Sequence, residues 1–204
     1  GTAVAFAATA PAQRGWRGGF GGGGESYVPD DTQTAREIAS HSTGTPNWTN
    51  PKSFGKDVFT FARIKRGYTP DGDGNRWSTD AADSDLNLSY RLQQMTSMRT
   101  DADGRFLWLT DKDLTHFPFI YMVEPGSLYL NDAEVIALRN YLNNGGFLML
   151  DDFWGEQAWS VVDRVFREVF PGRAWVELPL SHPIYHCVFE ITAKAQVPNV
   201  YMGE

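Results

Sequence analysis

The chain has 204 residues, of which 42% are hydrophobic and 14% aromatic, enough for one domain with a core and an appendage. The formal net charge of −7 and the absence of any basic run argue against a nucleic-acid-binding protein. The single cysteine, Cys187, excludes an internal disulfide and a zinc site built from several cysteines. No apolar run reaches the roughly 18 residues that a membrane-spanning helix needs.

The first residues resemble the later part of a secretory signal. Residues 1–12 are mostly small or apolar and end in Ala10-Pro11-Ala12, which resembles an A-x-A cleavage site. We therefore expect an exported, periplasmic protein that lies peripherally at a membrane. An Ala-rich terminus without a targeting role is the alternative. If residues 1–12 are kept, they can touch a membrane surface but are too short to span it.

Residues 13–56 are predicted to form an extended, Gly-rich arm. The glycine run at residues 15–24 cannot build a core, and glycine loses the most conformational freedom on ordering. A short helix is possible over residues 31–40, with Asp31 or Thr32 as its cap. The arm contains four aromatic residues at intervals, which are Trp16, Phe20, Tyr27 and Trp48. We predict that they anchor the arm on a partner protein.

Residues 57–204 are predicted to form the globular domain, in which strands alternate with helices. Strands are expected at residues 58–64, 106–109, 119–123 and 147–150, with further candidates at 175–178 and 184–191. Helices are expected from residue 84, over 132–142 and over 157–170. This alternation predicts an α/β three-layer sandwich with a mainly parallel sheet covered on both faces.

The spacing of apolar residues predicts which side of each helix is buried. In the first helix these residues are Leu88, Leu92 and Met95. In the second helix, which Gly145 ends, they are Val135, Leu138 and Leu142. In the third helix they are Trp159, Val162, Phe166 and Val169.

Residues 117–155 read as a complete βαβ unit whose second strand ends in Asp151 and Asp152. Working sites in open α/β sheets lie at the carboxyl ends of strands, so these carboxylates are candidates for a general acid/base pair or for metal ligands. Adjacent residues of a strand point to opposite faces, so at most one of them faces a given pocket unless the chain turns. Alternatively, one carboxylate caps the next helix or accepts hydrogen bonds from loop amides.

Two histidines have zinc-like H-x3-H spacing, His182 and His186. Pro183 disfavours a helix between them, and an extended chain would separate their rings by roughly 13 Å. Structural histidines are therefore the favoured interpretation. A zinc site formed with Asp152 is the alternative, and His182 is also an alternative catalytic group beside Asp151 and Asp152.

A second acidic segment resembles the opening of a calcium loop, at Asp71, Asp73 and Asn75. Arg76 stands where such a loop needs glycine, and Ala82 stands where it needs glutamate. A solvated turn is therefore the favoured interpretation, and we expect no metal or other cofactor.

Short motifs in the domain together resemble domain-of-unknown-function family 4159. They are Phe59-Thr60-Phe61-Ala62-Arg63, Trp77-Ser78-Thr79-Asp80, Asp85-Leu86-Asn87, Tyr121-Met122-Val123-Glu124-Pro125-Gly126, Gly145-Gly146-Phe147, Asp151-Asp152-Phe153-Trp154-Gly155 and His182-Pro183-Ile184-Tyr185-His186. The resemblance implies a class I glutamine-amidotransferase-like, flavodoxin-like fold, for a family with no established activity.

The same resemblance bears on chemistry. In the amidotransferase-like fold a nucleophilic cysteine occupies the turn after the Gly-Gly strand, whereas Asp151, Asp152 and Phe153 stand there in this chain. Cys187 lies far along the sequence. Glutaminase chemistry is therefore not expected, because a fold does not imply a function.

These observations favour a non-catalytic, exported accessory subunit that docks on a larger membrane-associated protein complex through its arm. An extrinsic subunit of an energy-transducing complex, such as a photosynthetic reaction centre, fits this description. One alternative is a hydrolase or metal-dependent enzyme that uses Asp151, Asp152 and His182 or His186. Another is a small-ligand sensor at the same cleft.

Overall fold

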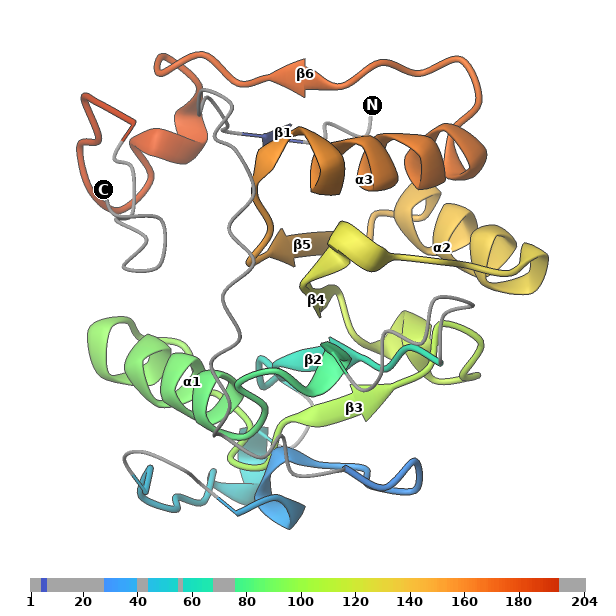
Figure 1. Ribbon diagram of the computed structural model, residues 1–204. Helices are drawn as coiled ribbons and strands as arrows, with labels where there is room; N and C mark the ends of the chain where they lie inside the picture. The colour runs from blue at the N-terminus through green and yellow to red at the C-terminus, as the bar shows by residue number, and fades with distance from the viewer. Residues whose placement is uncertain (1–4, 7–27, 40–43, 55–56, 68–75, 195–204) are drawn as a thin grey trace, which may run out of the picture. The chain divides into compact units, whose positions relative to one another are not determined.

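The computed structural model describes residues 5–6, 28–39, 44–54, 57–67 and 76–194. The chain divides into two compact units. The first comprises residues 12–171 and contains the main sheet and its helices, and the second comprises residues 1–11 and 172–204 (Figure 1).

The main sheet has four parallel strands in the order β3-β2-β4-β5. Their bounds are β2 Ala62–Ile64, β3 Arg105–Leu107, β4 Phe119–Val123 and β5 Phe147–Asp151. In the longest ladder, Phe119 lies opposite Phe147 and Val123 lies opposite Asp151. The predicted parallel α/β sandwich is confirmed. The predicted strand 58–64 starts as an isolated bridge between Phe59 and Thr100 and joins the ladder only at Ala62.

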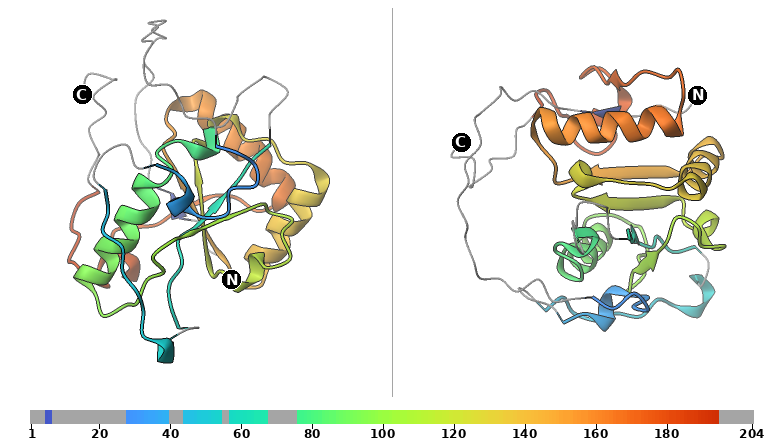
Figure 2. Two further views of the ribbon diagram at one scale, coloured as in Figure 1. Left: turned by 90° about the horizontal axis from the view of Figure 1, so that it is seen from below. Right: turned by 45° about the vertical axis from the view of Figure 1, so that its right-hand side comes forward.

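Helices lie on both faces of this sheet. They are α1 Asp83–Met95, α2 Asp132–Asn143 and α3 Gly155–Val169. The β2–α1–β3 and β4–α2–β5 connections run outward in opposite directions from the centre of the sheet. Because such crossovers are right-handed, α1 lies on one face, and α2 with its neighbour α3 lies on the other (Figure 2).

The predicted buried sides of α2 and α3 are largely confirmed. In α2, Val135, Leu138 and Leu142 are buried, and in α3, Val162, Phe166 and Val169 are buried, with Trp159 partly covered. A capping box at Asn131 and Glu134 begins α2, since each side chain accepts a hydrogen bond from the other residue's backbone N–H. Gly145, with φ of +94°, follows its end.

The predicted buried side of α1 is wrong. Leu88 and Met95 are 43% and 64% exposed, and the helix instead buries Asp85, Leu86 and Ser89. The side chain of Arg63 from β2 is the reason, because Asp85 turns inward to pair with it. A polar contact therefore orients this helix, and apolar spacing cannot detect it.

The described part of residues 28–54 is built into the first unit. Val28 and Ala35 belong to a core cluster with Trp77 and Phe106. A 3-10 turn, η1 Ala35–Glu37, stands where the helix over residues 31–40 was expected. The Nζ atom of buried Lys65 donates to the carbonyl oxygens of Asp30 and Thr32 at 2.6 and 2.8 Å, which ties this segment to the end of β2.

Further 3-10 turns connect the elements. They are η2 Lys52–Phe54, η3 Arg76–Ser78, η4 Leu114–His116, η5 Pro125–Ser127 and η6 Pro183–Tyr185.

The second unit contains a short parallel pair, β1 Ala5–Phe6 with β6 Val176–Glu177, at the predicted strand 175–178. The predicted strand 184–191 is wrong, because η6 begins at Pro183 and the described residues after it form no strand. His182 caps this turn and accepts a hydrogen bond from the Ile184 N–H, so the apolar residues that follow do not extend as a strand. Cys187, expected inside that strand, is exposed.

Candidate functional site

Hydrogen bonds connect the carboxyl ends of the strands, which is where the sequence predicts the site. The backbone N–H of Glu124, directly after β4, donates to the Asp151 carbonyl oxygen at 2.9 Å. Arg66, two residues after β2, donates to the carbonyl oxygens of Val123 and Glu124 at 2.9 and 3.2 Å. The order of connection reverses between β2 and β4, so the switch point of this sheet lies one strand away from the Asp151-Asp152 pair.

Three acidic residues in the first unit have left-handed backbone conformations. Asp80, Glu124 and Asp152 have φ values of 54°, 46° and 56°, which are uncommon for residues other than glycine. Asp152 therefore turns the chain immediately after β5, and the alternation rule of a strand does not apply to it. Strained backbone of this kind is concentrated at functional sites.

Asp151 is held in place by two hydrogen bonds. The hydroxyl of Tyr121 donates to its Oδ2 atom at 3.0 Å, and the backbone N–H of Asp152 donates to its Oδ1 atom at 2.9 Å. Burial, followed by the charge of Asp151, raises the pKa of Tyr121, so the phenol remains a donor at neutral pH. Asp151 thus accepts a hydrogen bond from a loop amide, as one of the two sequence-based alternatives predicts.

Asp152 is exposed, yet its environment disfavours its charge. Desolvation, followed by the charges of Asp151 and Asp80, raises the pKa of the Asp152 carboxyl. Its side chain does not cap α3, because Trp154 occupies the N-cap position without a side-chain capping bond. Like charges therefore repel one another at the end of β5. We call Asp80, Asp151 and Asp152 the acidic pole.

A buried ion pair lies under α1. Arg63 and Asp85 are both fully buried, with Nη2 and Oδ2 2.6 Å apart and Nε 3.0 Å from Oδ1. The remaining Arg63 donors reach Ser84 Oγ and the carbonyl oxygens of Trp77 and Thr79. The guanidinium also lies 5.0 Å from the ring centre of Tyr121, which connects this pair to the site.

An apolar row runs along the same face of the sheet toward its β5 edge. The rings of Phe61 and Phe119 are 5.6 Å apart, and those of Phe119 and Phe147 are stacked at 5.8 Å. Exposure rises along this row from 2% at Phe61 to 52% at Phe147, and the neighbouring Met149 is 38% exposed. We call Phe119, Phe147, Met149 and Asp151 the open face. Sequence reasoning missed it, because residues 147–150 are all apolar and show no exposed side.

The two candidate histidines make local hydrogen bonds in the second unit. His182 Nδ1 accepts from the Ile184 N–H at 3.2 Å. His186 Nε2 lies 2.7 Å from the Leu180 carbonyl oxygen, and its Nδ1 lies 2.8 Å from the Glu190 carboxylate. Within the described part of the chain, no three His, Cys, Asp or Glu side chains are placed to hold a metal ion.

One of the predicted partner-binding aromatics has a role inside its own unit. The indole N–H of Trp48 donates to the Thr100 carbonyl oxygen at 2.8 Å. Its ring lies 5.7 Å from that of Tyr90 and 5.6 Å from the Arg36 guanidinium. Trp16, Phe20 and Tyr27, like the acidic segment with Asp71, Asp73 and Asn75, lie outside the described residues.

The structure is a parallel α/β domain with a buried ion pair between Arg63 and Asp85. Its edge strand, β5, carries exposed apolar side chains and ends in Asp151. The family described as "Domain of unknown function (DUF4159)" matches residues 60–204, and the chain belongs to this family. No curated protein matches the sequence. Among the described residues, no helix is both long enough and apolar enough to cross a bilayer.

Proposed function

We propose that this chain is a non-catalytic accessory subunit that binds a partner protein through the open face of β5. The observation that carries the proposal is the exposure of Phe147 and Met149, on a strand at the edge of the sheet. Phe147 continues a row of neighbouring aromatic rings that begins in the core at Phe61, and Met149 lies two residues further along the same strand. Contiguous exposed apolar surface of this kind is characteristic of interaction sites, whereas isolated exposed hydrophobic residues are common everywhere.

The acidic pole beside this face indicates the chemistry of the partner. Asp151 is the last residue of the same strand, and the negative charges of Asp151 and Asp80 repel the Asp152 carboxylate. A Lys or Arg side chain placed there would relieve the repulsion, while apolar side chains cover Phe147 and Met149. We therefore assign the face to a partner segment that carries apolar residues next to a basic residue. A second copy of this chain fits less well, because each copy adds a formal charge of −7.

A non-catalytic role is supported by how Asp151 is used. Both of its carboxylate oxygens accept hydrogen bonds, one from the Tyr121 hydroxyl and one from the Asp152 N–H. Tyr121 in turn packs against the buried Arg63. Asp151 therefore joins the edge strand to the polar centre, which is a positioning role.

The cellular setting of the proposal rests on the sequence. The signal-like residues 1–12 support an exported subunit at a membrane. A photosynthetic complex is one example of such a partner, which no residue of the chain specifies. Trp16, Phe20 and Tyr27 would add a second contact from the arm. The open face and the arm can then bind one partner cooperatively, because linked contacts raise each other's effective concentration.

Site-specific crosslinking tests the proposal. A photoreactive phenylalanine analogue at position 147, in the full chain in its native cells, should crosslink to one protein segment containing apolar residues and a Lys or Arg. The same analogue at Ile136, which is equally exposed at 52% but lies on α2, is the control. Met149→Glu should then weaken binding of that partner at least about tenfold.

Three results would contradict this assignment. Crosslinks from position 147 could match those from position 136, or join two copies of this chain, or persist unchanged in Met149→Glu. A triple Trp16, Phe20 and Tyr27 to Ala variant separates the two contacts, since loss of binding only in that variant would assign docking to the arm alone.

A further inference from the structure

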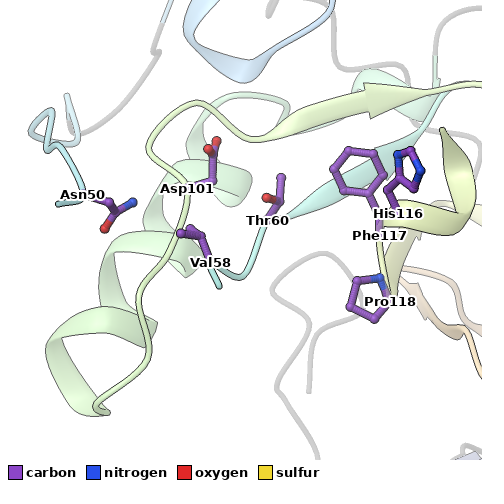
Figure 3. A pocket seen from close by; sticks show the side chains of 7 residues that line it. All are labelled: Asn50, Val58, Thr60, Asp101, His116, Phe117 and Pro118. Atoms are coloured by element: carbon purple, nitrogen blue, oxygen red, sulfur yellow. The ribbon is translucent and has the colours of Figure 1, made fainter. Parts of the chain in front are cut away.

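A hollow lies at the opposite end of the sheet from the acidic pole. Its volume is about 350 Å³, within the range of small-molecule sites, and we call it the amino-end pocket. The segments that precede β2, β3 and β4 form it together with Asn50. Its polar side chains are Asn50, Thr60, Asp101 and His116, and its apolar ones are Val58, Phe117 and Pro118 (Figure 3).

Two of the polar groups are held by the backbone around them. Asp101 Oδ1 accepts from the N–H groups of Asp103 and Gly104 at 3.0 and 2.9 Å, which fixes the carboxylate. Asn50 Nδ2 donates to the Thr100 carbonyl oxygen at 2.8 Å, which fixes the amide. The hydrogen bonds within the described chain thus leave Asp101 Oδ2 and Asn50 Oδ1 as available acceptors.

The remaining residues of the pocket form one polar side and one apolar side. In Figure 3, Thr60 lies between Asp101 and the neighbouring rings of His116 and Phe117. The Thr60 hydroxyl and the His116 imidazole can each both donate and accept, and within the described residues neither side chain makes a hydrogen bond. Val58, Phe117 and Pro118 supply the apolar wall.

We infer that the amino-end pocket binds a small neutral polyol of monosaccharide size. The polar wall offers acceptors at Asp101 and Asn50, and groups that both donate and accept at Thr60 and His116, so it suits a ligand whose hydroxyl groups do both. An aromatic ring beside that wall suits the C–H face of a sugar, because the positive hydrogens meet the negative face of the ring. The Asp101 carboxylate repels phosphorylated and carboxylated ligands and therefore disfavours them.

NMR titration of the full-length protein with D-glucose, D-galactose and mannitol tests the inference. At least one should shift the amide signals of Thr60, Asp101 and Phe117, with a dissociation constant near about 1 mM for so open a site. Asp101→Asn keeps the acceptor for the Asp103 and Gly104 amides but loses the charge, and should weaken binding about tenfold. Thr60→Val, which keeps the side-chain shape, should weaken it several-fold.

The control is Asp113→Asn, which removes a nearby carboxylate that is not part of the pocket wall and pairs with Arg105. It should leave the affinity unchanged. The inference fails if none of the three compounds shifts these signals, or if Asp101→Asn and Thr60→Val both bind like the unmodified protein. It also fails if inorganic phosphate or acetate binds as strongly, or if glucosamine binds far better than glucose, which would assign the site to an anion or an amine.

Discussion

The two ends of one sheet face differ in an unusual way. Where α1 covers β2, the face holds the fully buried ion pair of Arg63 and Asp85. Toward β5, the same face carries Phe147 and Met149, which are 52% and 38% exposed. Charge lies inside and aromatic surface lies outside, which is the reverse of the usual distribution. The difference separates a part of the face that specifies the fold from a part that is available for binding.

The covered end can hold charges because every donor of Arg63 has an acceptor. A buried ion pair adds little to stability unless its hydrogen bonds are complete, but removal of one partner leaves an uncompensated charge. The pair therefore determines where α1 sits. The open end has no such ion pair, and the Phe147 side chain there is 52% exposed.

Loss of the buried pair should have the largest effect on stability. Arg63→Met leaves the Asp85 carboxylate buried without its partner, and should lower the free energy of unfolding by about 3–5 kcal/mol in urea denaturation. Arg63→Met combined with Asp85→Leu should recover most of this loss, because no charge remains buried. Arg167→Met is the surface control, since that side chain pairs with Asp163 in solvent and should change little. Equal effects of Arg63→Met and Arg167→Met would remove the contrast between the two ends.

Truncation of two phenylalanines along the aromatic row should show the boundary between core and open face. Phe61→Ala, at a side chain that is 2% exposed, should cost about 3–5 kcal/mol. Phe147→Ala, at 52% exposure, should cost about 1 kcal/mol, because only part of its surface is buried. Urea midpoints at equal slope measure both. A cost for Phe147→Ala as large as that for Phe61→Ala would show that β5 is covered in solution.

Removal of one charge from the acidic pole should have the smallest effect on stability, and this effect should depend on pH. The pKa of Asp152 is raised in the folded state, by desolvation first and then by Asp151 and Asp80. The folded protein thus binds the proton more tightly than the unfolded chain, so ionised Asp152 destabilises at neutral pH and stability rises as pH falls through its pKa. Asp152→Asn should therefore raise the melting temperature slightly at pH 7, with the gain fading toward about pH 3–4. A gain that does not change with pH would contradict this cause.

Much of the architecture follows from local patterns. The βαβ unit over residues 117–155, the parallel sheet and the buried sides of α2 and α3 were all predicted from apolar spacing and turn residues. The placement of Asp151 and Asp152 at the end of β5 was also predicted. The predictions failed where a polar contact overrode the apolar pattern, a contact distant in sequence for α1 and a local one for residues 184–191. Leu88 and Met95 are exposed because Asp85 turns toward Arg63, and residues 184–191 form no strand because His182 caps a turn at Pro183.

By itself, the sequence determined the segments that form α1, α2, α3 and the strands of the main sheet, because the spacing of apolar residues within each segment is a local property. It also determined the acidic end of β5 and the family. Only the tertiary structure decided that β5 lies at an edge with Phe147 exposed, and that Arg63 meets Asp85. It also decided that the amino ends of three strands surround a pocket with Asn50, Thr60, Asp101 and His116. These features depend on strand order and on contacts between side chains from separate segments. A local sequence pattern determines neither of them.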